Sequence, residues 1–435
     1  MAIQEHISPV RRAAAAVVGN ALEFYDFITY GFFSIQIGHA FFPSRSVYAS
    51  LMLSLATFGV GFVTRPIGGV VIGALADRVG RRPAMMLSFT LMGGAIIAMA
   101  LIPSYARIGV AAPVLAILAR LVQGFSLGGE VGPTTAYVLE SAPLRKRGLM
   151  VSWQFASQAV GTLAASLVAF ALSNLMAPAA LDSYGWRIAF LLGAAIVPYG
   201  LWLRRNLPET LPESLPKTLA ASGGRDAVEG RRPVSGLVRI IVLAFVVLAS
   251  ATIGTYVVNY IATFAQATLH MTPAAAFAAS AVGQAMTLVG AIFGGWLSDR
   301  VGRRPVMVLP SLAQLAVVIP IFSWITRTRS PMGLIVGMAI YALLGAIGSG
   351  VFHTAFSESL PARIRGSAFA ITYALAIALF GGTTQLVITW LIHATGSIMA
   401  PAWYLLAASG FGVIARCLII ESAPVRIAAL KLAVG

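Results

Sequence analysis

Charged residues, cysteine and the motifs of soluble catalytic sites are all scarce in this chain of 435 residues. Only 10% of the residues are charged, against about 25% in soluble domains, while 58% are hydrophobic. This balance indicates a membrane protein. The single cysteine, Cys417, excludes an internal disulfide and a cysteine metal site. The sequence has no His-Glu-x-x-His motif, serine elbow or His/Cys cluster, so we expect no enzyme, no cofactor and no metal site.

Acidic residues are much rarer than basic ones, and the net charge of +16 could suggest a nucleic-acid partner. The placement of the basic residues argues against it, because most of them fall on one side if the apolar segments cross a membrane alternately. The positive-inside rule then places both termini and the central linker in the cytoplasm, which predicts a multi-pass protein of the bacterial inner membrane. Several loop arginines could also touch anionic lipid. We see no cleavable signal peptide.

Long apolar runs define the expected fold. A spanning helix needs about 20 mostly apolar residues, and twelve such segments are present, whereas strand periodicity is absent. We therefore expect an all-α membrane protein with an N-terminal six-helix bundle (1–203), a proline-rich cytoplasmic linker (204–236) and a C-terminal six-helix bundle (237–435). The expected spans are 13–38, 48–76, 83–103, 109–139, 149–173, 186–203, 237–265, 274–298, 305–325, 332–358, 367–393 and 398–419.

Two loop motifs recur in the same order in the two halves. GALADRVGRRP at 73–83 returns as GWLSDRVGRRP at 295–305, and ESAPLRKRG at 140–148 matches ESLPARIRG at 358–366. This repetition indicates one unit duplicated in parallel. Acids beside arginines at helix ends could lock one side of the protein closed. The gating candidates are Asp77, Arg81, Arg145, Asp299, Arg303 and Arg363.

Ionisable residues inside spans are costly, so each is a functional candidate. We expect the charge chemistry to lie in the N-terminal half, because His353 is the one ionisable residue that we place at a span centre of the C-terminal half. The N-terminal half has two candidate cations, Arg65 and Arg120. The candidate proton-coupling acids are Asp26, Glu23 and Glu130.

Asp26 and Arg120 lie near the middle of the first and fourth expected spans. Such charges can pair, and protonation of Asp26 would then release Arg120; the alternative is a static structural pair. Glu23 shares a helix face with Asp26 and could be a second proton site or the partner of Arg65. Arg65 could instead hold a substrate carboxylate. Glu130 lies among glycines, and we favour a structural or gating role for it over substrate binding.

Neutral polar residues in the spans are expected to face the bundle interior, where they either line a cavity or bond between helices. His353 could donate to a carboxylate or be a packed histidine with its bonds satisfied. The candidate substrate-binding residues are Arg120, Arg65, Gln123, Gln154, Gln158, Tyr256, Asn259, Gln284, His353 and Tyr373.

The doubled GxLxDRxGRR pattern resembles the major facilitator superfamily over the whole chain. GNALEFYDF at 19–27, RPIG at 65–68 and RLVQGFSLGGE at 120–130 are similar to its metabolite–proton symporters. SWQ at 152–154, FGGTT at 380–384 and the short linker and tail look most like the citrate and tricarballylate symporters. Resemblance to proton-coupled sugar porters, in which an aspartate of the first span and an arginine of the fourth form the proton switch, assigns that switch to Asp26 and Arg120.

We therefore expect a monomeric, proton-coupled symporter that imports a small organic anion by alternating access. The resemblance implies a di- or tricarboxylate such as citrate. A carrier for a zwitterion of the proline/betaine type, or for an aromatic acid, is an alternative within transport. A membrane sensor is the alternative outside transport, although the linker is too short and too polar for a signalling domain.

Overall fold

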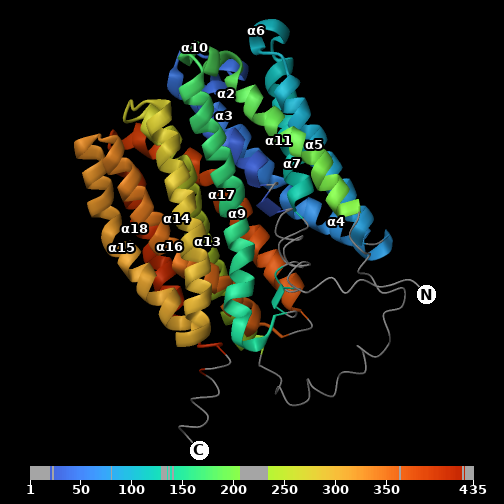
Figure 1. Cartoon of the computed structure of the whole chain (residues 1–435), viewed down its shortest axis with the longest axis vertical. Coiled ribbons are helices and arrows are strands. Elements are labelled where there is room, and N and C mark those ends of the chain that lie inside the picture. The colour runs from blue at the N-terminus through green and yellow to red at the C-terminus, as the bar shows by residue number, and fades with distance from the viewer. Residues whose placement is uncertain are drawn as a thin grey trace, which may run out of the picture.

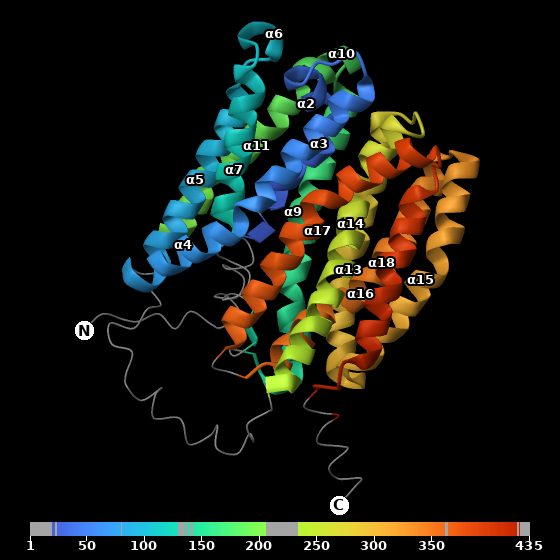
Figure 2. The ribbon, with the colours of Figure 1, turned by 180° about the vertical axis from the view of Figure 1, so that it is seen from behind.

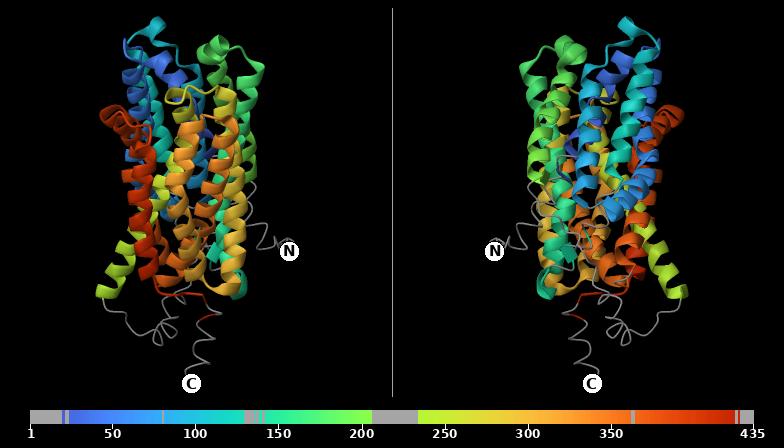
Figure 3. Two further views of the ribbon diagram at one scale, coloured as in Figure 1. Left: turned by 90° about the vertical axis from the view of Figure 1, so that its left-hand side faces the viewer. Right: turned by 90° about the vertical axis from the view of Figure 1, so that its right-hand side faces the viewer.

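The computed structural model describes residues 20–21, 24–79, 81–128, 135, 138–139, 142–205, 234–361, 364–423 and 426. Within these ranges every regular element is a helix. The long helices run roughly along the long axis of the molecule, as the two side views show (Figure 3). The fold is therefore built from long, nearly aligned helices.

The helices before residue 206 begin with helical residues 24–32, which lead into α2. The further elements of this part are α2 (Ser34–Phe41), α3 (Val47–Val63), α4 (Arg65–Val79), α5 (Arg81–Leu101), α6 (Tyr105–Ile108), α7 (Ala111–Leu127), the 3-10 turn η1 (Leu144–Lys146), α9 (Arg147–Leu175), α10 (Pro178–Ala180), the π turn η2 (Leu181–Gly185) and α11 (Trp186–Arg205). The helices after residue 233 are α13 (Val234–Ala267), α14 (Pro273–Val301), α15 (Arg303–Thr328), α16 (Pro331–Ser359), α17 (Arg365–Thr395) and α18 (Ala400–Leu418).

All twelve expected spans contain helix in the described residues. Eight helical stretches of the described chain are long and apolar enough to cross a membrane, and parts of α5 and α7 form shorter apolar helices. Large apolar side chains such as Val70, Ile371 and Phe411 are exposed on the outside of the helices. Such exposure is expected of a surface that faces lipid, where the backbone must be hydrogen-bonded within each helix. The prediction of an all-α membrane protein is confirmed.

Local sequence marks where several of these helices begin. Thr272 precedes Pro273 at the start of α14, and Ser330 precedes Pro331 at the start of α16. Each hydroxyl accepts the N–H of the third helical residue at 3.4 Å. A hydroxyl cap followed by proline favours a helix start, because proline has no N–H to leave unpaired in the first turn.

One expected span, 48–76, is divided between α3 and α4 at Thr64. Pro66, two residues after Thr64, has no N–H to donate to a carbonyl of the preceding turn. The Gly68 N–H still bonds to the Thr64 carbonyl at 2.8 Å, so the chain continues after a local break. This break lies beside Arg65, one of the candidate cations.

The part of the chain before residue 206 packs against the part after 233 mainly through two helix pairs. α9 lies beside α14 (Figure 1), and α3 lies beside α17 (Figure 2). Glycines allow both approaches: a Cβ on Gly59 would be 2.8 Å from the Gly382 carbonyl oxygen, and a Cβ on Gly148 would be 2.6 Å from that of Gly295. We call the end of the molecule where α9 begins and α14 ends the motif end, and α6 and α10 lie at the other end (Figure 1).

Candidate functional site

A buried chain of polar contacts links the first and fourth expected spans. Arg120 Nη1 donates to Gln123 Oε1 at 2.7 Å, and Gln123 Nε2 donates to Asp26 Oδ2 at 2.8 Å. All three side chains are buried, and Arg120 and Gln123 have no exposed surface. The expected direct pair between Asp26 and Arg120 is therefore replaced by a contact through an amide, because Gln123 lies one helical turn after Arg120 and fills the space between the charges.

This contact chain leaves hydrogen-bonding capacity unused. Asp26 Oδ1, Arg120 Nε and Arg120 Nη2 have no partner within the described residues. The Arg65 Nε atom also lacks a partner. No described carboxylate lies within ion-pair distance of either arginine. Two buried cations thus share a region in which no described carboxylate binds them directly, and a buried charge is costly unless it is paired.

Aromatic rings supply part of the missing stabilisation. The guanidinium carbons of Arg65 and Arg120 lie 4.4 Å and 4.2 Å from the centroid of the Phe27 ring. Arg65 also contacts the Phe62 ring at 4.5 Å, and Arg120 contacts the Tyr30 ring at 4.6 Å. Cation–π contacts are worth about 0.5–2 kcal/mol and leave the N–H groups free to bind an anion.

Glycines in α7 bring these two arginines together. A Cβ on Gly124 would collide with the Gly61 carbonyl of α3, and a Cβ on Gly128 would collide with the Arg65 carbonyl of α4. Thr64 bonds across the same contact, from its hydroxyl to the Leu121 carbonyl at 2.7 Å. Backbone-to-backbone packing of this kind is typical of helices that meet at small residues in a membrane.

The neutral polar candidates form two separate contacts. Gln158 of α9 donates to the Tyr373 hydroxyl of α17 at 3.1 Å, and Gln284 of α14 donates to Asn259 of α13 at 2.9 Å. Gln154 is buried, and its side-chain oxygen has no partner in the described chain. The second contact lies wholly within the helices after residue 233, whereas the first one bridges the two parts of the chain.

Tyr256 connects the neutral groups to the arginine region. Its ring packs edge-on against Phe62 at 5.4 Å, and Phe62 is itself in contact with Arg65. The structure therefore places Tyr256, Arg65 and Arg120 in one aromatic-lined region. His353 lies among rings instead, with Phe155 and Phe369 each 5.7 Å away, and its Nδ1 has no partner within the described residues. His353 is therefore packed among rings without the full set of hydrogen bonds that the sequence analysis considered, and no described carboxylate is its partner.

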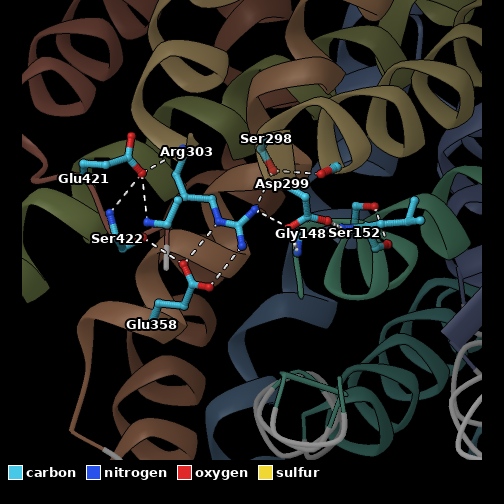
Figure 4. A network of polar contacts seen from close by, with 11 residues as sticks. Gly148, Ser152, Ser298, Asp299, Arg303, Glu358, Glu421 and Ser422 are labelled. Atoms are coloured by element: carbon cyan, nitrogen blue, oxygen red, sulfur yellow. Dashed lines mark hydrogen bonds and ion pairs between the residues drawn. The ribbon is translucent and has the colours of Figure 1, made fainter. Parts of the chain in front are cut away.

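A denser network lies at the motif end, where α9 begins against α14 (Figure 4). The Asp299 carboxylate accepts the backbone N–H groups of Gly148 at 2.8 Å and Leu149 at 2.9 Å. Arg303 Nη1 donates to the same carboxylate at 2.7 Å, and Arg303 Nη2 donates to Glu358 at 3.1 Å. Asp299 therefore caps the first turn of α9, whose N–H groups have no partners within the helix.

Several candidate residues lie outside the described part of the chain, namely Glu23, Glu130 and Arg363. The backbones of Asp77 and Arg81 lie at the end of α4 and the start of α5, and their side chains are likewise outside the description. Arg145 lies in η1 and is exposed.

Two charged residues take places that the sequence analysis did not assign. Glu421 accepts the backbone N–H groups of Arg303 at 2.8 Å and Arg304 at 3.0 Å, so it caps α15. Arg416 is only 4% exposed inside α18, which adds a buried cation to the C-terminal half, where the sequence analysis placed His353 alone at a span centre. The signal for Arg416 was present, as an arginine inside an apolar segment, but its place near the segment's end suggested a side chain that reaches the membrane surface.

Comparison with known proteins gives a consistent result over almost the whole chain. Residues 16–383 match the family described as the Major Facilitator Superfamily. The chain is 34% identical to a citrate–proton symporter of Klebsiella pneumoniae, covering 92% of this chain and 89% of that protein. It is 35% identical to an alpha-ketoglutarate permease of Escherichia coli strain K12, covering 91% of each chain. A proline/betaine transporter of the same strain is 33% identical, with 94% and 83% covered.

Solved structures agree on the fold. The structure of a D-xylose–proton symporter matches with a TM-score of 0.74 at 19% sequence identity, covering 95% of this chain and 97% of that one. At this level of identity the likeness shows the architecture alone, which is the expected arrangement of two six-helix halves.

Proposed function

This chain belongs to the major facilitator superfamily, and on that premise we propose that it is a proton-coupled symporter for a small organic anion. It is a transporter and not an enzyme. The observation that carries the proposal is the buried Asp26–Gln123–Arg120 contact chain, which has unused N–H groups on Arg120 beside a second cation, Arg65. An acid that can take a proton and a cation that can take an anion are the two elements that symport requires.

The proposed coupling runs through the Gln123 amide. When Asp26 is ionised, its negative charge is held next to the Arg120 cation through two hydrogen bonds of 2.7 Å and 2.8 Å. When Asp26 is protonated, that compensation is lost, and Arg120 gains from binding a substrate anion instead. The bound proton and the bound anion therefore favour each other. A static pair without a transport role is the alternative that the experiment below tests.

We propose a di- or tricarboxylate, such as citrate, as the substrate. Two cations that no described carboxylate contacts suit a substrate with more than one negative charge, and guanidinium groups bind carboxylates with two parallel hydrogen bonds. Two of the relatives, the citrate–proton symporter and the alpha-ketoglutarate permease, carry names of such acids. The proline/betaine relatives keep a zwitterion as the competing substrate class.

We further propose that the halves 1–203 and 237–435 rock about this region, with 204–236 as the linker. The Asp299 network would then be a gate that holds the motif end closed, together with Asp77, Arg81, Arg145 and Arg363 of the repeated motifs. We propose that the motif end and both termini lie in the bacterial cytoplasm, because basic residues are in excess in the loops of that end. We expect the carrier to act as a monomer.

Transport by purified protein in proteoliposomes tests the proposal. With an inward proton gradient, we expect the vesicles to accumulate labelled citrate, and a protonophore should abolish this. Arg120→Ala should abolish binding and transport, because removing one partner of a buried charged contact costs about 3–5 kcal/mol, or more than 100-fold in affinity. Arg187→Ala is the matched control: among the described residues Arg187 donates to the Ala100 and Ile102 carbonyls and lies over the Trp186 ring, away from the arginine region.

Asp26→Asn separates binding from coupling. The amide resembles the protonated acid, so the variant should still exchange citrate in a counterflow assay but should not accumulate it. A variant that still concentrates citrate would move the coupling role to Glu23 or Glu130. Accumulation that follows sodium and persists with the protonophore would refute proton coupling, and accumulation of betaine in place of citrate would refute the anion assignment.

A further inference from the structure

Besides Arg303 of the gate network, the helices after residue 233 contain another buried cation. Arg416 of α18 is 4% exposed, and its Nε has no hydrogen-bond partner within the described chain. No described carboxylate lies within ion-pair distance of it. It belongs neither to the arginine region of Arg65 and Arg120 nor to the gate network.

The guanidinium group of Arg416 points into the helix bundle. The position of a Cβ on Gly412, one turn earlier in α18, would be 3.3 Å from Arg416 Nη1 and would collide with the Ser250 hydroxyl of α13. The guanidinium and the Ser250 hydroxyl are therefore near neighbours. An arginine that only avoided the membrane would reach the other way, toward the nearby end of α18.

Arg416 lines a pocket together with groups from five helices. The polar lining residues are Ser250, Thr255, Gln284, Thr287, Gln314, Tyr341, Ser349, Ser409 and Arg416, so six of them carry hydroxyl groups. The Tyr341 hydroxyl is buried, and no described group meets the geometry of a hydrogen bond with it. Tyr341 lies roughly 15 Å along α16 from its first residue, at 1.5 Å per residue, so the pocket is near mid-membrane.

We propose that this pocket is a binding site for a small anion, distinct from the arginine region at Asp26 and Arg120. A lone cation at this depth is costly, and hydroxyl groups cannot neutralise it. A carboxylate or halide between Arg416 and the hydroxyls of Ser250, Ser409 and Tyr341 would both neutralise the charge and satisfy the free donors. The anion stabilises the bundle of α13, α15, α16 and α18 whether or not a substrate is bound at Arg120.

Thermal unfolding without substrate or gradient tests this site directly. The purified protein is kept in detergent in sodium isethionate, whose bulky anion is the reference, and chloride or acetate replaces it at constant ionic strength and pH. We expect the unfolding temperature to rise by about 2–4 °C, because an anion that binds only the folded protein raises the free energy of unfolding. A rise with acetate alone identifies a carboxylate site, and a rise with both identifies a general small-anion site.

Substitutions test whether the rise in unfolding temperature comes from binding in this pocket. Arg416→Gln should abolish it, whereas Arg120→Gln should retain it. Ser250→Asp places a carboxylate beside Arg416, so this variant should unfold at a higher temperature in isethionate than the size-matched Ser250→Asn, and it should no longer respond to chloride or acetate. The Ser250 pair decides the question if Arg416→Gln does not fold. The proposal would be overturned if the parent protein showed no rise in unfolding temperature, or if the rise were unchanged in Arg416→Gln or lost in Arg120→Gln. Equal unfolding temperatures of the two Ser250 variants in isethionate would also overturn it.

Discussion

Replacing Asp299 by asparagine should open the motif end. The carboxylate accepts three hydrogen bonds of 2.7–2.9 Å, two of them from the backbone of α9 and one from Arg303. Both carboxylate oxygens are used, whereas asparagine has a single acceptor oxygen and no charge. At least one hydrogen bond to a charged group is therefore lost, which is worth about 1.5–3 kcal/mol. The ratio of closed to open forms should fall by about 10- to 150-fold.

The reactivity of a buried thiol measures this ratio. Ser152 of α9 has no exposed surface and faces Gly295 of α14 across the closed contact. We would place a cysteine there, as Ser152→Cys in a Cys417→Ser background, and follow its labelling by a maleimide. The labelling rate should rise about 10-fold or more in Asp299→Asn, because it follows the population of the open form. Asp182→Asn is the matched control, since Asp182 lies at the other end of the molecule and is 45% exposed.

Equal labelling rates in the parent, the control and Asp299→Asn would refute the gating role. Faster labelling accompanied by loss of citrate binding would also contradict the reasoning, because the network does not touch the arginine region. The expected variant binds citrate normally and differs only in how often its motif end is open.

Two further outcomes follow from the geometry. Gly59→Ala should slow transport strongly, because the added methyl would lie 2.8 Å from the Gly382 carbonyl oxygen and would push α3 away from α17; Gly94→Ala, where nothing lies within 4 Å, is the control, and equal uptake rates would exclude a role for this close contact. Glu421→Gln should lower the unfolding free energy by about 1–2 kcal/mol, because an amide has one acceptor oxygen for the two N–H groups at the start of α15; an unchanged unfolding temperature would show that the cap contributes nothing.

The helices could be predicted well from the sequence because a backbone surrounded by lipid has few alternative conformations. A spanning segment must satisfy its backbone internally, so long apolar runs become helices almost regardless of their detailed residues. The repeated motif also pointed to Asp299 and Arg303, which the structure brings into one network. The second acid that Arg303 contacts, Glu358, belongs to the second repeated motif, and this contact depends on how α15 and α16 pack, which helix patterns do not specify.

The contact chain at Asp26 shows where sequence reasoning stops. Arg120 and Gln123 are three residues apart on one helix, so their contact follows from helical spacing. The contact between Gln123 and Asp26 joins two helices and depends on their rotation and approach, which residue spacing does not specify. Sequence spacing therefore indicated the right charges but not the amide between them.

The buried arginines differ in how many of their N–H groups have hydrogen-bond acceptors, and this difference distinguishes structural from binding roles. Arg303 donates from Nε, Nη1 and Nη2 to two acids and a serine, so it has little capacity left for a ligand. Among the described residues Arg120 donates to a neutral amide alone, and Arg120, Arg65 and Arg416 each leave at least Nε without a described partner. A membrane interior keeps such donors only where something compensates their charge during the working cycle. The satisfied arginine thus suits a latch, and the three unsatisfied ones suit the places where anions bind.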